Sequence, residues 1–139
     1  MSGTTFSSSE NSSDFLSSTI NLSLELLSDI LHVINTMIDL SPEHEIIWNR
    51  QITELTIDIS RFVEVTTLVS KVIMKQKKTV LPGIKESHIH LLFILKAMNQ
   101  AQHKLDMVAL EDLIKYELKD NLTQWKIDLI PQTRRLLST

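Results

Sequence analysis

Histidines are the side chains of this chain that could most readily bind a metal ion or carry a phosphoryl group. His44-Glu45 opens like a zinc-protease motif, in which two histidines four residues apart share one helix face. The fourth residue after His44 is Trp48, so the second ligand is missing. His88 and His90 are two residues apart, which places them roughly 200° from each other around a helix. Glu-x-x-His pairs of a di-iron bundle are also missing, and we predict no metal or other cofactor.

His88 lies on the apolar row of a predicted helix, and histidine phosphotransfer bundles also place one histidine on a four-helix scaffold. Those proteins surround the histidine with a His-x-x-Lys-Gly sequence, whereas residues 88–93 here read HIHLLF. The sequence therefore favours a half-buried imidazole at the end of the core, and no catalytic residue is predicted. A phosphotransfer or metal-dependent protein centred on His88 and His90 is the alternative.

The lysines of residues 71–85 form the main basic cluster of the sequence. Lys71, Lys75 and Lys78 share a predicted helix face, with Lys77 and Lys85 close by. Such a cluster could attract phosphate or an acidic partner, but no aromatic residues alternate with it to stack on bases. The sequence favours a solvated helix end whose lysines complement the negative end of the helix dipole. We predict no nucleic-acid partner.

Composition narrows the class of protein further. The chain has 139 residues, no cysteine, two glycines and a formal net charge of −3. This length suits one domain, and the absence of cysteine excludes disulfides and thiolate metal sites. Gly3 and Gly83 are too far apart to form a phosphate-binding loop. We find neither a secretory signal nor a charge-free window of about 20 residues, and we predict a cytoplasmic protein without membrane contact.

The elements that would position these residues are four helices. Residues 1–13 hold six serines and few apolar anchors, which predicts a disordered tail before a single domain over residues 14–139. Apolar residues then recur at steps of three and four, which predicts helices at about 14–40, 42–79, 85–104 and 106–130. Short connections make consecutive helices antiparallel, so we expect an all-α, antiparallel up-down four-helix bundle.

Start and stop signals set the predicted helix ends. Ser41-Pro42-Glu43 is a strong start signal, Pro82-Gly83 breaks the chain, and Asp106 is a natural cap for the fourth helix. Pro131 is expected to end or kink that helix. Residues 55–59 alternate like a strand, but the helical apolar row persists over twenty-six residues, and a helix is favoured.

Apolar residues exceed what one central seam of a bundle needs. The second predicted helix adds Val65 and Leu68 beside its main row, and the third is apolar on nearly every side around Leu92 and Phe93. This surplus indicates either a generous core or an exposed face that binds an amphipathic helix. We predict Val65, Leu68, Leu92, Phe93 and Trp125 as partner-binding residues.

Residues 97–125 resemble the C-terminal half of flagellar export chaperones of the FliS type, and also resemble small uncharacterised bacterial helical proteins. The matching residues are Ala101, Asp106, the segment ALEDLI at 109–114, and Trp125. The spacing to Trp125 is about one residue longer here, and the tyrosine-rich opening of the family is missing. The resemblance implies a cytoplasmic chaperone that holds helices of its partner along apolar grooves.

Together these observations predict a non-enzymatic helical protein-binding module, and its more specific form would be an export or assembly chaperone. Its partner would be an amphipathic helix of another protein. A structural homodimer closed through the extra apolar faces is the other alternative.

Overall fold

The computed structural model describes residues 3–40, 44–79 and 83–137, and within these ranges the chain is helical apart from short caps and turns, with no strand. The prediction of an all-α protein is therefore confirmed. The first three helices are α1 (Gly3–Leu40), α2 (Glu45–Lys77) and α3 (Ile84–His103). A last helix follows, made of α4 (Met107–Asp112), the π-helical η1 (Leu113–Leu118), α5 (Lys119–Gln124), the π-helical η2 (Trp125–Leu129) and α6 (Ile130–Leu137).

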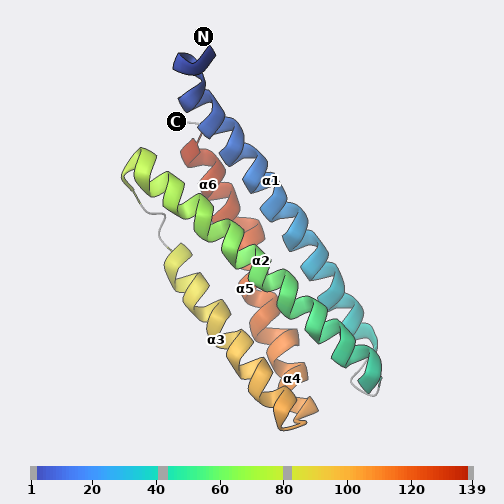
Figure 1. Ribbon diagram of the computed structural model, residues 1–139. Coiled ribbons are helices and arrows are strands. Elements are labelled where there is room, and N and C mark those ends of the chain that lie inside the picture. The colour runs from blue at the N-terminus through green and yellow to red at the C-terminus, as the bar shows by residue number, and fades with distance from the viewer. Residues whose placement is uncertain (1–2, 41–43, 80–82, 138–139) are drawn as a thin grey trace.

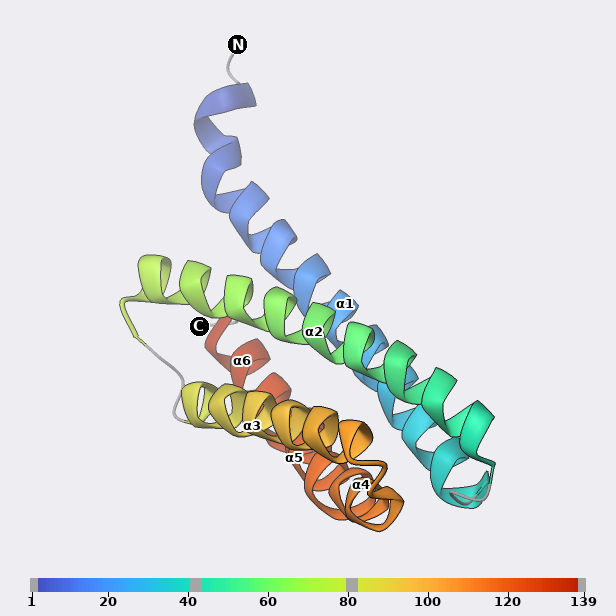
Figure 2. The same cartoon turned by 60° about the horizontal axis from the view of Figure 1, so that its bottom comes forward.

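The helices pack as two antiparallel hairpins (Figures 1 and 2). α1 and α2 form one hairpin, and α3 with the last helix forms the other. The last helix joins them, because α5 and α6 contact α1 while α4, η1 and α5 contact α3. Contacts between α2 and α3 are sparser.

The core fills the space among the four helical rods with large apolar side chains. Its centre is aromatic, since the ring of Phe62 meets the ring of Trp125 edge to face at 5.2 Å between centroids. Near the start of α2, Trp48 donates its indole N–H to the carbonyl of Met37 at 3.2 Å, which connects α2 to the end of α1. The buried residues of the last helix include Leu110, Ile114, Leu118, Leu122 and Leu129.

α2 is one continuous helix of 33 residues, about 50 Å long at 1.5 Å per residue. The strand alternative for residues 55–59 is therefore wrong, and the helical row persists through them. The C-terminal turns of α2 project beyond their neighbours, because residues 74–79 are all exposed. Lys78 ends the helix in a left-handed conformation, its N–H bonded to the carbonyl of Met74 at 2.9 Å.

Of the predicted signals before α2 and α3, only Gly83 lies within the described residues. The Ser41-Pro42-Glu43 signal lies outside the described residues, and α2 begins after His44, whose side chain makes no capping bond. Gly83 precedes α3 with φ at 90°, a conformation that favours glycine. The Pro82 half of that signal lies outside the described residues.

α1 begins at Gly3, so the disordered tail predicted for residues 1–13 is not what the structure shows over residues 3–13. The helix continues through them because no glycine or proline interrupts residues 4–40. Figure 2 shows that these first turns project beyond the other helices. The prediction of disorder rested on the serine-rich composition, and serine is only moderately unfavourable inside a helix.

The last helix runs past Pro131 to Leu137, so the prediction that Pro131 ends or kinks it near residue 130 is wrong about the end. Proline lacks the backbone N–H and crowds the preceding turn of an α-helix. The wide π-turn η2 ends at Leu129, two residues before Pro131, and this widened turn accommodates both the missing bond and the ring.

Candidate partner-binding surface

Trp125, one of the five predicted partner-binding residues, belongs to the core. Only 1% of its surface is exposed, and its ring packs against Phe62 and against His88, whose centroid is 5.1 Å away. Assigning it to a surface was wrong, because it continues the buried row of Leu118, Leu122 and Leu129.

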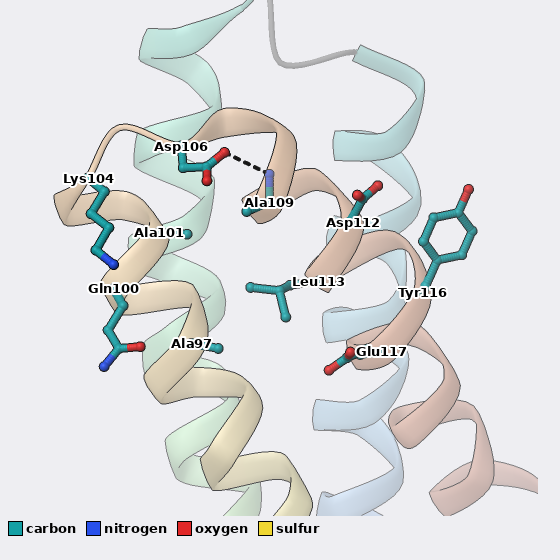
Figure 3. Close-up of a pocket in the computed structure, with 10 residues that line it drawn as sticks. All are labelled: Ala97, Gln100, Ala101, Lys104, Asp106, Ala109, Asp112, Leu113, Tyr116 and Glu117. Atoms are coloured by element: carbon teal, nitrogen blue, oxygen red, sulfur yellow. Dashed lines mark hydrogen bonds between the residues drawn. The ribbon is translucent and has the colours of Figure 1, made fainter.

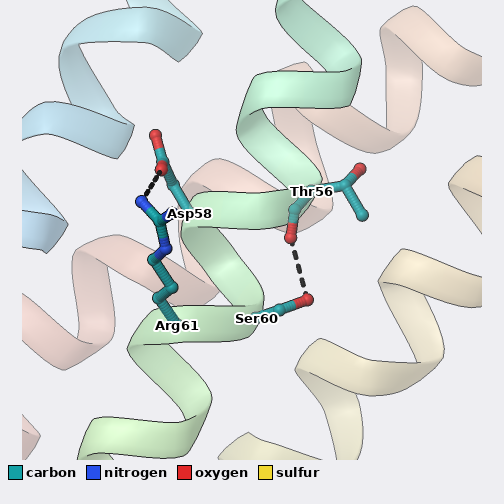
Figure 4. A network of polar contacts seen from close by, with 4 residues as sticks. All are labelled: Thr56, Asp58, Ser60 and Arg61. Atoms are coloured by element: carbon teal, nitrogen blue, oxygen red, sulfur yellow. Dashed lines mark hydrogen bonds and ion pairs between the residues drawn. The ribbon is translucent and has the colours of Figure 1, made fainter.

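The remaining four predicted residues lie on two different faces. Val65 is half-buried and Leu68 is exposed, and they follow Arg61 by four and seven residues on the same side of α2. Figure 4 shows Arg61 directed away from α3, with its guanidinium 3.7 Å from the carboxylate of Asp58. On the opposite side of α2, Ser60 and Thr56 point toward α3 (Figure 4). Val65 and Leu68 therefore do not share a surface with Leu92 and Phe93.

The outer side of α3 carries three exposed apolar residues, which we name the α3 apolar stripe. Ile89, Leu92 and Phe93 expose 59%, 52% and 64% of their surfaces. Their spacing of three and four residues places them side by side on one helical turn. Leu92 and Phe93 were predicted as partner-binding residues from the sequence and Ile89 was not, although the same periodicity includes it.

A groove of about 540 Å³, here called the α3–η1 groove, lies between α3 and the start of the last helix (Figure 3). Ala97 and Ala101 face it from α3, and Leu113 extends into it from η1. Its polar lining consists of Gln100, Lys104, Asp106, Asp112, Tyr116 and Glu117. None of the groove residues was predicted as a site. The signal that could have found it is the pair of alanines four residues apart, which leaves space beside a short connection.

The short connection between α3 and α4 closes one end of the groove. Leu105 adopts a left-handed conformation with φ at 55°, and the N–H of Asp106 bonds to the carbonyl of Ala101 at 2.9 Å. The carboxylate of Asp106 then accepts the N–H of Ala109 at 3.1 Å, which confirms the predicted cap (Figure 3). Both hairpin arms are thereby fixed where the groove begins.

The imidazole of His88 forms a hydrogen bond inside the protein, with the side chain of Thr66. Its Nε2 lies 2.7 Å from Oγ1 of Thr66, whose hydroxyl proton is already directed to the carbonyl of Phe62 at 2.8 Å. The hydroxyl therefore accepts from His88, which places a proton on Nε2. Burial lowers the pKa of His88 below its ordinary value, because the charged ring would lose solvation.

His90 has a different partner, on the last helix. Its Nδ1 lies 3.2 Å from the side-chain nitrogen of Asn121, which also donates to the carbonyl of Ser87 at 3.3 Å. The two histidines thus bond to different elements, α2 and α5, and do not converge. Among the described residues, no group of three or more histidine, aspartate or glutamate side chains could hold a metal ion.

A second, internal cavity has a volume of only about 20 Å³ and lies where α1, α2, the start of α3 and the last helix meet. Ser23, Thr66 and Thr133 contribute hydroxyl groups to its lining, and each of them bonds to the carbonyl four residues earlier in its own helix. This volume is comparable to that of one water molecule and is too small for an organic ligand.

Comparison of the chain with protein-family models, with curated proteins and with solved structures gives no match. The resemblance of residues 97–125 to FliS-type chaperones therefore stays a prediction. Within the described residues, no helix combines the length and the apolar character that crossing a membrane requires.

Proposed function

We propose that this chain is a non-enzymatic helical protein-binding module of the cytoplasm, acting as an export or assembly chaperone for a partner's amphipathic helix. The observation that carries the proposal is the α3 apolar stripe, three large side chains exposed together on one turn. The inner side of the same helix supplies Leu91 and Ile94 to the core, both fully buried. Ile89, Leu92 and Phe93 are therefore additional to the residues that close the core.

The size of the stripe sets what it can contribute to binding. Fully burying a side chain of this kind is worth about 1.5–3 kcal/mol, and roughly half of that remains available at each half-exposed position. Three positions then supply about 2–4.5 kcal/mol before the cost of association is subtracted, so the stripe alone supports binding no tighter than roughly millimolar. A partner that binds more tightly must also contact neighbouring surface, and the α3–η1 groove on the same hairpin is suited to this.

The antiparallel up-down four-helix arrangement forms part of this proposal, and the two antiparallel hairpins support it. Such a scaffold presents grooves between adjacent helices, which is how helix-in-groove recognition operates. The resemblance of residues 97–125 to export chaperones points to the same mode of binding. We include neither nucleic acid nor membrane among the partners.

Site-specific photo-crosslinking in the native cell tests the proposal. The crosslinking amino acid p-benzoylphenylalanine is placed at Phe93 and, as a control, at Ile57 of α2, where 48% of the side chain is exposed. We expect a discrete heterologous product at position 93 that is absent at position 57 and is lost when Leu92→Gln is added. Equal products at the two positions would refute a specific surface. A product containing only this chain would instead establish the homodimer.

A further inference from the structure

The walls of the α3–η1 groove carry an excess of negative charge. Asp106, Asp112 and Glu117 contribute three carboxylates to its lining, against one ammonium group from Lys104. Asp106 is engaged as the helix cap. Asp112 and Glu117 are exposed, and neither forms an ion pair within the described part of the chain. Two carboxylates on one wall are thus available to a ligand.

The floor of the groove is apolar and continues the α3 apolar stripe. Ala97 follows Phe93 by four residues, so the two lie one above the other on the same face of α3. Leu113 extends across from η1, and Glu117 points the same way one turn later (Figure 3). An apolar track therefore leads from Phe93 into the groove, with carboxylates from α4 and η1 along its other side.

Tyr116 extends the wall of the groove and is also more than half exposed. The ammonium group of Lys115 lies 5.5 Å from the centre of its ring, so one face of the tyrosine already contacts a cation. This lysine adds one positive charge at the outer edge, and the charge of the groove itself remains negative. A space of about 540 Å³ admits several side chains of a docked helix.

Resting on the protein-binding function above, we propose that the α3–η1 groove selects an amphipathic helix with a basic polar face. A large apolar side chain of that helix would lie on Ala97 and Leu113, and its lysine or arginine residues would pair with Asp112 and Glu117. Charges at the rim of an interface act mainly on specificity and association rate. The preference for a basic partner should therefore weaken as salt screens the two carboxylates.

The test uses the full chain and two synthetic helical peptides with the same leucine face, one with lysines and one with glutamates on the polar face. Binding is measured by fluorescence anisotropy at low and high salt. At low salt, we expect the lysine peptide to bind at least about tenfold more tightly than the glutamate peptide. This difference in affinity should shrink at high salt. The double variant Asp112→Lys, Glu117→Lys should reverse the preference. The control Glu54→Lys, Glu64→Lys changes the net charge equally on exposed positions of α2 and should leave it unchanged.

The possible results separate this inference from the proposed function. Equal binding of both peptides that is lost in Phe93→Ser would overturn charge selection while keeping the protein-binding surface. Failure of both peptides to bind at low salt would overturn both. An equal effect of the α2 control pair would show attraction by net charge alone and would also overturn the inference.

A second copy of the chain is the competing occupant, because the exposed end of α2 carries Lys71, Lys75 and Lys78 beside the exposed Met74. Sedimentation of the protein alone decides this. A monomer at all salt concentrations supports a heterologous partner. A salt-sensitive dimer that dissociates in Glu117→Lys would assign the groove to self-association and overturn the heterologous partner.

Discussion

Adjacent leucines in α3 provide the sharpest test of the exposed stripe. Leu91 is fully buried, whereas Leu92 exposes 52% of its surface. The substitutions Leu91→Ala and Leu92→Ala remove the same atoms one residue apart on one helix, so helix propensity changes equally. Any difference between their effects on the free energy of unfolding reports burial alone.

The expected losses in the free energy of unfolding differ severalfold between the two variants. Leu91→Ala removes contacts on every side and leaves a cavity, which costs about 2–5 kcal/mol. Leu92 has about half of its surface covered, and half of a transfer free energy of about 1.5–3 kcal/mol is roughly 1 kcal/mol. No closed cavity forms at a position open to solvent. The free energy of unfolding of a domain of this kind is roughly 5–15 kcal/mol, so only Leu91→Ala should remove a large share of it.

Urea denaturation followed by far-UV circular dichroism measures both variants against the parent chain. The free energy of unfolding should fall with urea concentration at the same slope in all three proteins. The urea concentration at the unfolding midpoint should decrease far more for Leu91→Ala than for Leu92→Ala. A Leu92→Ala variant as unstable as Leu91→Ala would mean that Leu92 belongs to the core. The surplus apolar surface, and the function proposed from it, would then lose their basis.

Three further outcomes follow from single contacts. Asp106→Ala should lower the free energy of unfolding by about 1 kcal/mol because the N–H of Ala109 loses its cap, while Asp106→Asn should retain most of it in the same urea assay. Gly83→Ala should cost about 1–2 kcal/mol in thermal melts, because φ is 90° and the new Cβ would lie 3.3 Å from Leu129. The contribution of His88 to the free energy of unfolding should be fully present above pH 6.5 and should be lost as the pH falls below it. The reason is that His88 takes up a proton in the unfolded chain at a higher pH than it does when buried in the folded protein. Urea titrations across this range should show a smaller decrease for His88→Gln, and an unchanged decrease would contradict the assignment.

Periodicity predicted the helices well because the repeat of apolar residues is long. Within the described ranges, α3 spans Ile84–His103 against a predicted 85–104, and Asp106 caps the next helix as its side-chain chemistry requires. Periodicity cannot say which of two apolar rows faces inward. That choice depends on where the neighbouring helices lie, and it separates the exposed Phe93 from the buried Trp125.

The groove was not predictable from apolar patterning, because alanine is neutral in such patterns. Ala97 and Ala101 define it by the volume that they leave empty beside Leu113, and this depends on how closely two helices approach. The π-turns did leave a sequence signal. Leu110, Ile114, Leu118 and Leu122 follow each other by three steps of four, which an α-helix would rotate by about 120° in total. All four are fully buried, because η1 corrects the rotation.

The same wide turn has a consequence for comparing chains of different length. A π-turn contains one residue more than an α-turn, so inserting or deleting a residue there leaves the faces of the flanking segments aligned. The predicted resemblance to FliS-type chaperones requires about one extra residue between Asp106 and Trp125, and η1 lies inside that segment. An alignment gap placed within residues 113–118 would therefore preserve the inward orientation of Leu122 and Trp125.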